Sequence, residues 1–312
     1  MPAPRPGLRG RQATHPVRVE DGFLAVVAHL TDLLGSGHHV PSDRPQACRV
    51  FLEALRSSDR ARYATILGAL VDRLAVWLPA DVYERAPVLL PHVMRDNRCR
   101  KEACPAGHRK ARKGRVGEPR DMWSTPTAGG YVRDDNSLVK NLVSDGTVVS
   151  GVGGAVRLGP SYVACHVWAM ATVPDPWLNS FVPNLVWLPR PLDVLSDQDE
   201  VMQALLRARA RGRFARALVH PSLTSELWAS LPAGESAEQP PNQGREFDLD
   251  QRWLANRLAK IVRMADLLGA LVAGRPAGSS GHSHYDQHLV ELGSAQVQPL
   301  ATRLAQYVVD LG

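Results

Sequence analysis

The sequence predicts an α+β protein in which a β-rich centre is flanked by α-helical regions on both sides. Apolar residues recur with helical spacing over residues 20–95, and again from about residue 198 toward the end of the chain. Between residues 131 and 192, short valine-rich runs are interrupted by Asp-Gly, Gly-Gly and Gly-Pro pairs, which is typical of β-hairpins. These two patterns together predict the order helical, β-rich, helical.

Four units follow from these patterns. Residues 1–95 are expected to form an N-terminal helical domain, in which Asp59 and Asp81 cap helices or lie in their first turns. Residues 96–130 read as a basic loop, because their apolar pattern gives way to charge, glycine and proline. Residues 131–200 are predicted to be the only β-rich part. Residues 201–312 form a C-terminal helical region, with a long helix from near Asp248 and a last helix at the C-terminus.

Composition sets broad limits on location and chemistry. The 312 residues include no run of about 18 apolar residues and no apolar signal-peptide core near the N-terminus, so we expect a cytoplasmic protein. The four cysteines are too few and too unevenly spaced for a disulfide framework in a chain of this length. Reduced thiols or a metal site are the expected states.

Positive charge is concentrated in one segment. The net charge is +6, and residues 98–115 hold eight lysines or arginines against one acid. Such a cluster attracts nucleic-acid phosphates, and the residues expected to contact them are Arg109, Lys110, Arg112, Lys113 and Arg115. A second cluster, "RARARGRFAR", begins at Arg207. The alternative is that these charges are simply solvated.

Three polar residues follow one another at suggestive spacing in the centre. His166 ends the strand-like run "SYVACH", Asn184 opens "NLVWLP" eighteen residues later, and Asp193 lies nine residues beyond Asn184. This order resembles the HNH, or ββα-metal, endonucleases of the restriction and defence type. The match covers residues 130–200, about a fifth of the chain, and "NLVWLP" is its most specific part.

The resemblance implies a central ββα-metal (HNH-like) hairpin-helix core and a role for each residue. His166 would be the general base that activates a water, Asn184 would hold the loop, and Asp193 would bind Mg²⁺ or Mn²⁺. Cys165 occupies the position where many members have an aspartate ligand, and it is a soft ligand that suits Mg²⁺ poorly. Asp197 and Asp175 are the other carboxylates available as ligands.

A second metal site is suggested within the basic loop. Cys99, Cys104 and His108 have the spacing C-x4-C-x3-H, and structural Zn²⁺ would need a fourth ligand such as His92 or a distant cysteine. Plain thiols are the alternative. Three histidines near the C-terminus, His282, His284 and His288, are expected to lie in a surface loop without a ligand.

Three functions remain open. The first is a metal-dependent HNH-type DNA endonuclease that hydrolyses phosphodiester bonds and acts as a homodimer, because cutting both strands of a duplex requires two active sites. The second is a non-catalytic nucleic-acid-binding or regulatory protein, which Cys165 favours. The third is a metal-dependent RNase, since nothing in the sequence separates DNA from RNA as the substrate.

Overall fold

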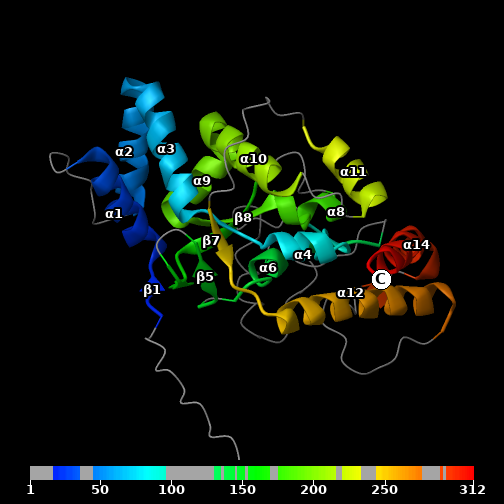
Figure 1. The fold of residues 1–312 in the computed structure, drawn as a ribbon. Helices are drawn as coiled ribbons and strands as arrows, with labels where there is room; N and C mark the ends of the chain where they lie inside the picture. The colour runs from blue at the N-terminus through cyan, green and yellow to red at the C-terminus, as the bar shows by residue number, and fades with distance from the viewer. Residues whose placement is uncertain are drawn as a thin grey trace, which may run out of the picture.

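The computed structural model shows a mixed α+β fold built around one seven-stranded sheet (Figure 1). It describes residues 17–35, 45–95, 130–134, 137–144, 146–151, 154–168, 175–215, 220–232, 244–275, 289–290 and 293–312. In this part of the chain, no helix is both long and apolar enough to cross a membrane.

The N-terminal region supplies helices and three short strands. The helices are α1 (Gly22–Leu34), α2 (Pro45–Ser58), α3 (Arg60–Leu74) and α4 (Ala80–Arg85), and the strands are β1 (Val19–Glu20), β2 (Val76–Trp77) and β3 (Val93–Arg95). Asp59 caps α3 through a hydrogen bond from the Arg62 amide, and Asp81 lies in the first turn of α4, as predicted.

The centre contains five strands and four helical segments. The strands are β4 (Val132–Asp134), β5 (Val148–Ser150), β6 (Val156–Leu158), β7 (Tyr162–His166) and β8 (Leu185–Pro189). The helices are α6 (Ser137–Lys140), α8 (Pro176–Asn179) and α9 (Arg190–Gln198), with the 3₁₀ turn η3 (Val182–Asn184) before β8.

The C-terminal region adds one strand and four helices. These are α10 (Glu200–Phe214), α11 (Pro221–Ser230), β9 (Arg245–Phe247), α12 (Gln251–Val272) and α14 (Ser294–Asp310). The two long helices predicted near the C-terminus are therefore present. Asp250 caps α12 by accepting a hydrogen bond from the Trp253 amide, so the helix begins slightly later than predicted.

Strand order shows that the sheet is assembled from all parts of the chain. The order is β1-β6-β5-β9-β2-β8-β7, and β3 pairs separately with β4 in parallel. Strand β2 lies in the middle, antiparallel to β8 and parallel to β9. The expectation that only residues 131–200 are β-rich is therefore wrong: β1, β2 and β9 lie outside that range. Two-residue and three-residue strands are too short to show an alternating pattern, and their partners are distant in sequence.

A single hydrophobic core connects these parts. It includes Val76 and Trp77 of β2, which are almost fully buried, together with residues from nearly every helix. A buried polar network adds to it where β1 meets β7 and β9. Arg245, which is 3% exposed, donates a 2.5 Å hydrogen bond to Glu20, and the Tyr162 hydroxyl donates to the same carboxylate at 2.6 Å.

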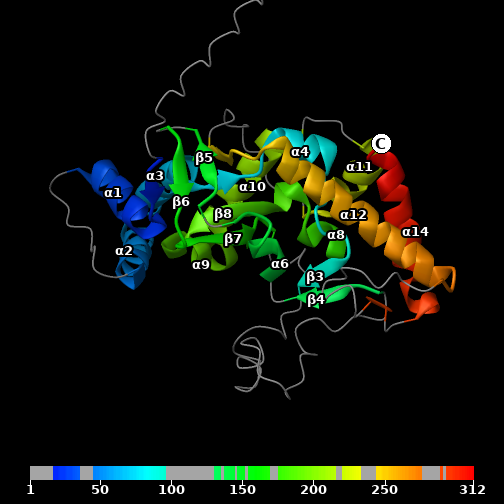
Figure 2. The same cartoon turned by 90° about the horizontal axis from the view of Figure 1, so that it is seen from below.

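The helices lie at two ends of the sheet. Figures 1 and 2 place α1, α2 and α3 at one end of the molecule and the antiparallel-looking pair α12 and α14 at the other. Helices α9 and α10 lie between, and α9 packs on β7 and β8. A shallow surface groove lies along α12 at that end of the molecule.

Candidate functional site

Strands β7 and β8 form the antiparallel pair predicted around His166. The register runs from Tyr162 opposite Pro189 to His166 opposite Leu185. Asn184 immediately precedes β8, and Asp193 lies in the first turn of α9, which follows β8 directly. The two paired strands are therefore followed by a helix, but α8 and the 3₁₀ turn η3 lie between the strands along the chain.

His166 lies inside the protein. Its side chain is 1% exposed, and its Nε2 is 2.9 Å from the backbone carbonyl oxygen of Asn179, so Nε2 carries the proton and donates. The other ring nitrogen, Nδ1, is buried without a hydrogen-bond partner. Burial, together with the smaller effect of the nearby positive charge of Arg95, lowers the pKa of His166 to about 4. The imidazole is therefore neutral at physiological pH.

Asn184 braces the irregular segment between the two strands. Its side-chain oxygen accepts a 2.8 Å hydrogen bond from the Trp168 amide, and its side-chain nitrogen donates a 2.8 Å bond to the Leu178 carbonyl. Its backbone carbonyl also accepts from the Val167 amide. The expected role of Asn184 in holding the loop matches these contacts, which use both polar atoms of its amide and leave it a structural residue.

Cys165 and His166 face opposite sides of β7, because neighbouring side chains alternate along a strand. Cys165 is close enough to Asp193 and Ser196 of α9 that both affect its pKa, whereas His166 contacts α8. His166 and Asp193 therefore lie on opposite sides of β7, and this arrangement does not fit the roles that the resemblance implies for them, a base and a metal ligand acting at one site. The sequence "YVACH" already contained this signal, because the side chains of Cys165 and His166, as neighbours on a strand, point to opposite faces of the sheet.

Two carboxylates do come together on α9. Asp193 and Asp197 are one turn apart, and the charge of Asp197 raises the pKa of Asp193, although burial is the larger cause of that increase. One or two carboxylates together with substrate phosphates can hold Mg²⁺. Burial raises the pKa of Cys165 to about 12, and a soft thiol suits Mg²⁺ poorly, so Cys165 is an unfavourable third ligand for that ion. In the described ranges, no group of three ligating side chains suits a metal ion.

Within the described residues, the arginines of the second basic cluster are engaged within the fold; Arg216 lies outside them. Arg209 makes a bidentate pair with Asp72 at 2.5 and 2.8 Å, and Arg213 pairs with Glu246. Arg211 lies over the edge-to-face pair of Trp168 and Trp228, with its guanidinium carbon 5.7 and 5.6 Å from their ring centroids. The interpretation of this cluster as a phosphate-binding surface is therefore not supported, because the residues across from it supply the negative and aromatic partners.

Helix α12 carries a different basic face, which motif analysis of the sequence missed. Trp253, Asn256, Arg257, Lys260 and Arg263 line a shallow surface groove along it. The Arg257 guanidinium carbon lies 5.4 Å above the ring of Trp253. The residues recur every three or four positions, so helical periodicity is the signal that places them on one face.

Like charges on this face repel one another. The pKa of Lys260 is lowered chiefly by the positive charge of Arg257, with burial and the charge of Arg263 as smaller causes. Arg257 also donates hydrogen bonds to the backbone carbonyls of Asn141 and Leu142. Across the described ranges, the side chains of Arg252 and Lys260 make no hydrogen bond or ion pair. An anion placed here would relieve the repulsion.

Several predicted site residues lie outside the described residues. They are the basic loop residues Arg109, Lys110, Arg112, Lys113 and Arg115, the zinc candidates Cys99, Cys104 and His108, and the C-terminal histidines His282, His284 and His288. Their roles stay predictions. Asp175, a further ligand candidate, instead caps α8 by accepting hydrogen bonds from the Trp177 and Leu178 amides.

Comparison with known proteins adds no relative. No family model matches the chain, and neither the curated proteins nor the solved structures include a significant match.

Proposed function

We propose that the protein binds nucleic acid through the cationic and aromatic face of α12. The observation that carries this proposal is the stacking of Arg257 on Trp253 beside Lys260 and Arg263 in one groove. Cations that follow a phosphate backbone, combined with aromatic rings, are the usual components of a surface that binds nucleic acid without strong sequence preference. The basic segment 98–115 would add to the same electrostatic attraction.

The test compares two double variants that each remove two positive charges. Arg252→Gln with Lys260→Gln removes one cation of the groove, Lys260, and Arg252, which lies one helical turn before Asn256 and outside the groove lining; neither makes a hydrogen bond or ion pair within the described ranges. Arg62→Gln with Arg85→Gln is the matched control, because both arginines are exposed and lie on other helices. Binding of wild type and variants to duplex DNA, single-stranded DNA and RNA is measured by fluorescence anisotropy over a range of salt concentrations.

The α12 variant should bind every substrate more weakly. On duplex DNA its log-log salt slope should be shallower by about 1.8, since each phosphate contact contributes about 0.9. The control variant should keep the wild-type slope. If both variants lower affinity equally, the effect is one of net charge and the α12 surface is not the binding site.

A second candidate function is metal-dependent phosphodiester hydrolysis, as an endonuclease acting on DNA or as an RNase. Two observations favour it: the helix that follows the two paired strands, and the pairing of Asp193 with Asp197 near the charges of Arg190 and Lys140. Those carboxylates would hold Mg²⁺ or Mn²⁺, which would stabilise negative charge on the scissile phosphate. The burial of His166, at 1% exposure, is the observation that favours binding without cleavage instead.

Cleavage assays separate the two candidates. Supercoiled plasmid and structured RNA are incubated with the protein and Mg²⁺, Mn²⁺ or EDTA. Under the binding proposal, all reactions leave the substrate intact. Cleavage that disappears with EDTA and in Asp193→Asn would establish the second candidate, and the substrate that is cut would separate DNA endonuclease from RNase.

A further inference from the structure

The edge of the sheet beside α6 contains a pocket that the proposed binding surface does not use. Its floor is apolar and aromatic, with Trp187 5% exposed and Phe247 2% exposed, and their ring centroids lie 4.9 Å apart in an edge-to-face arrangement. Its rim is polar and comes from α6 and the start of α9. The pocket therefore has the usual composition of a small-ligand site, in which an apolar floor is combined with a few polar groups.

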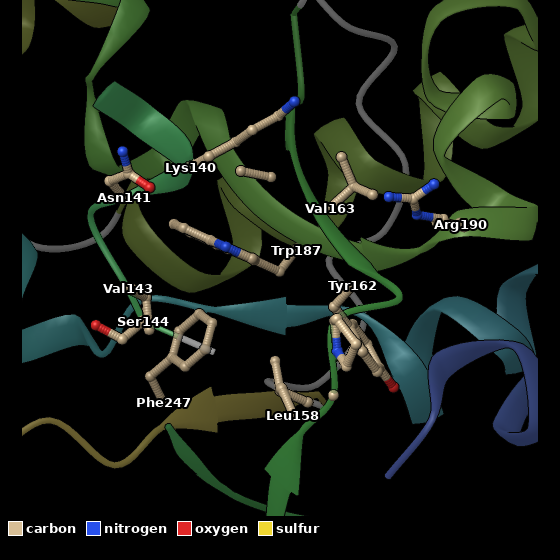
Figure 3. A pocket seen from close by; sticks show the side chains of 13 residues that line it. Lys140, Asn141, Val143, Ser144, Leu158, Tyr162, Val163, Trp187, Arg190 and Phe247 are labelled. Atoms are coloured by element: carbon tan, nitrogen blue, oxygen red, sulfur yellow. The ribbon is translucent and has the colours of Figure 1, made fainter. Parts of the chain in front are cut away.

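Hydrogen-bond donors predominate among the polar groups of this pocket. Figure 3 shows Lys140 and Arg190 on either side of Val163, Asn141 beside Lys140, Ser144 beside Phe247, and the indole of Trp187 between these two pairs. The lining includes no aspartate or glutamate. Lysine, arginine and the indole N–H can only donate, whereas amides and hydroxyls can also donate.

These donors have few partners within the protein. In the described part of the chain, the side chains of Lys140, Arg190 and Trp187 make no hydrogen bond and no ion pair within 4 Å. Trp187 is 5% exposed as a whole, but its indole nitrogen is not among the fully buried side-chain atoms without a partner, so this donor is accessible to a molecule that enters the pocket. The positive charges of Lys140 and Arg190 both lower the pKa of Asp193, but this carboxylate does not line the pocket.

We infer that this pocket binds a phosphate monoester group, with Lys140 and Arg190 contacting the phosphate oxygens and the Trp187 N–H completing the set of donors. A phosphate monoester carries close to two negative charges and three strongly accepting oxygens near neutral pH. Arginine presents a planar fork that matches phosphate, and lysine adds a compact charge. The group belongs either to a free nucleotide or to the 5′ end of a nucleic-acid strand, which the test distinguishes.

Isothermal titration calorimetry with adenosine 5′-monophosphate, inorganic phosphate and adenosine provides the test. Wild type should bind the two phosphates and not adenosine. Lys140→Gln with Arg190→Gln should weaken phosphate binding by about 100-fold, because each charge-assisted contact contributes about tenfold. Trp187→Phe keeps an aromatic floor and removes one neutral donor, so it should weaken binding by about fivefold.

Further arms identify the source of the phosphate and keep this inference separate from the α12 proposal. A 5′-phosphorylated single-stranded oligonucleotide is compared with its 5′-hydroxyl form, and a preference that Lys140→Gln with Arg190→Gln abolishes indicates strand ends as the source. Arg252→Gln with Lys260→Gln should bind adenosine 5′-monophosphate as wild type does. The inference is overturned if neither phosphate nor 5′-phosphorylated oligonucleotide binds, or if the Lys140 and Arg190 variant binds them unchanged while its thermal unfolding matches wild type.

Discussion

Helices α10 and α12 have the same charge content but differ in how much of it the fold pairs: Arg257 of α12 is engaged as Arg211 of α10 is, whereas Lys260 has no hydrogen bond or ion pair in the described ranges. Each carries four cations and one acid along its length. In α10, Arg209 faces Asp72 and Arg211 lies over a pair of tryptophan rings, so these charges hold the fold together. In α12, Lys260 faces other cations. The difference teaches that an arginine-rich stretch indicates an external partner only where the fold does not supply an internal one.

The same rule extends to His166, the buried basic group on the strand next to α9. An arginine inside the protein must be paired, whereas a histidine can be neutral. His166 has taken the second course, because burial lowers its pKa to about 4. We therefore expect the largest change in the free energy of unfolding when a lower pH forces a proton, and so a positive charge, onto the His166 ring.

We expect acid to destabilise the protein through His166. In the unfolded chain its pKa is near 6.5, so the unfolded state takes up a proton below that pH while the folded state does not until about pH 4. The contribution is therefore complete above pH 6.5 and falls as the pH drops to about 4, by about 3 kcal/mol. Urea unfolding of wild type at several pH values measures it.

His166→Gln is the matched control for this measurement, because its amide can still donate to the Asn179 carbonyl and does not titrate. Aspartates and glutamates titrate in the same range in both proteins, so the difference between the two curves isolates His166. Curves that stay parallel between pH 6.5 and 4 would show that the ring is protonated in the folded protein, and would contradict the burial argument.

The internal pairing of α10 is tested next by removing the carboxylate. Asp72→Ala leaves the Arg209 guanidinium, 14% exposed, without its bidentate partner. We expect the free energy of unfolding to fall by about 2 kcal/mol, which is less than for a fully buried pair because some water reaches both groups. Asp32→Ala, whose carboxylate is 74% exposed and 4.0 Å from Arg73, should cost less than about 0.5 kcal/mol. If Asp72→Ala and Asp32→Ala lowered the free energy of unfolding equally, the ion pair between Arg209 and Asp72 would contribute no more than an exposed surface pair.

The stacking of Arg211 should contribute a smaller amount. Arg211→Ala removes a guanidinium lying over Trp168 and Trp228, and desolvated cation-π contacts are worth about 1 to 2 kcal/mol. Arg211→Lys keeps the charge and loses the planar fork that also donates to the Pro232 carbonyl. Thermal unfolding should rank wild type above Arg211→Lys and Arg211→Lys above Arg211→Ala. The reverse order for the two variants would mean that packing, rather than charge over the rings, accounts for the loss.

The sequence predicts more about local elements than about their partners. The strand "YVACH" was readable from local signals such as turn residues, whereas the helix that starts before Asp193 was expected only from the resemblance, since helical spacing resumes at about residue 198. Strands β1, β2 and β9 were not readable, since two or three residues show no period and their pairing depends on contacts between distant segments. The side-chain environment of His166 and the pairing of Arg209 with Asp72 depend on the same distant contacts.

The smallest expected effect on stability is at α12, and it completes the comparison with α10. Arg252→Gln with Lys260→Gln should change the free energy of unfolding by no more than about 0.5 kcal/mol, because neither side chain has a hydrogen bond or ion pair in the described part of the chain. The sign should be stabilising at low salt, since Lys260 is repelled by Arg257 and Arg263. Added salt screens that repulsion, so the difference in unfolding free energy from wild type should shrink between about 0.01 and about 1 M ionic strength.

Urea unfolding of wild type and variant at low and high salt measures the sign of the difference and its dependence on salt. A clear loss of stability at low salt would show that these two charges hold the fold together, as those of α10 do, and would remove the physical reason for assigning an external anionic partner to α12.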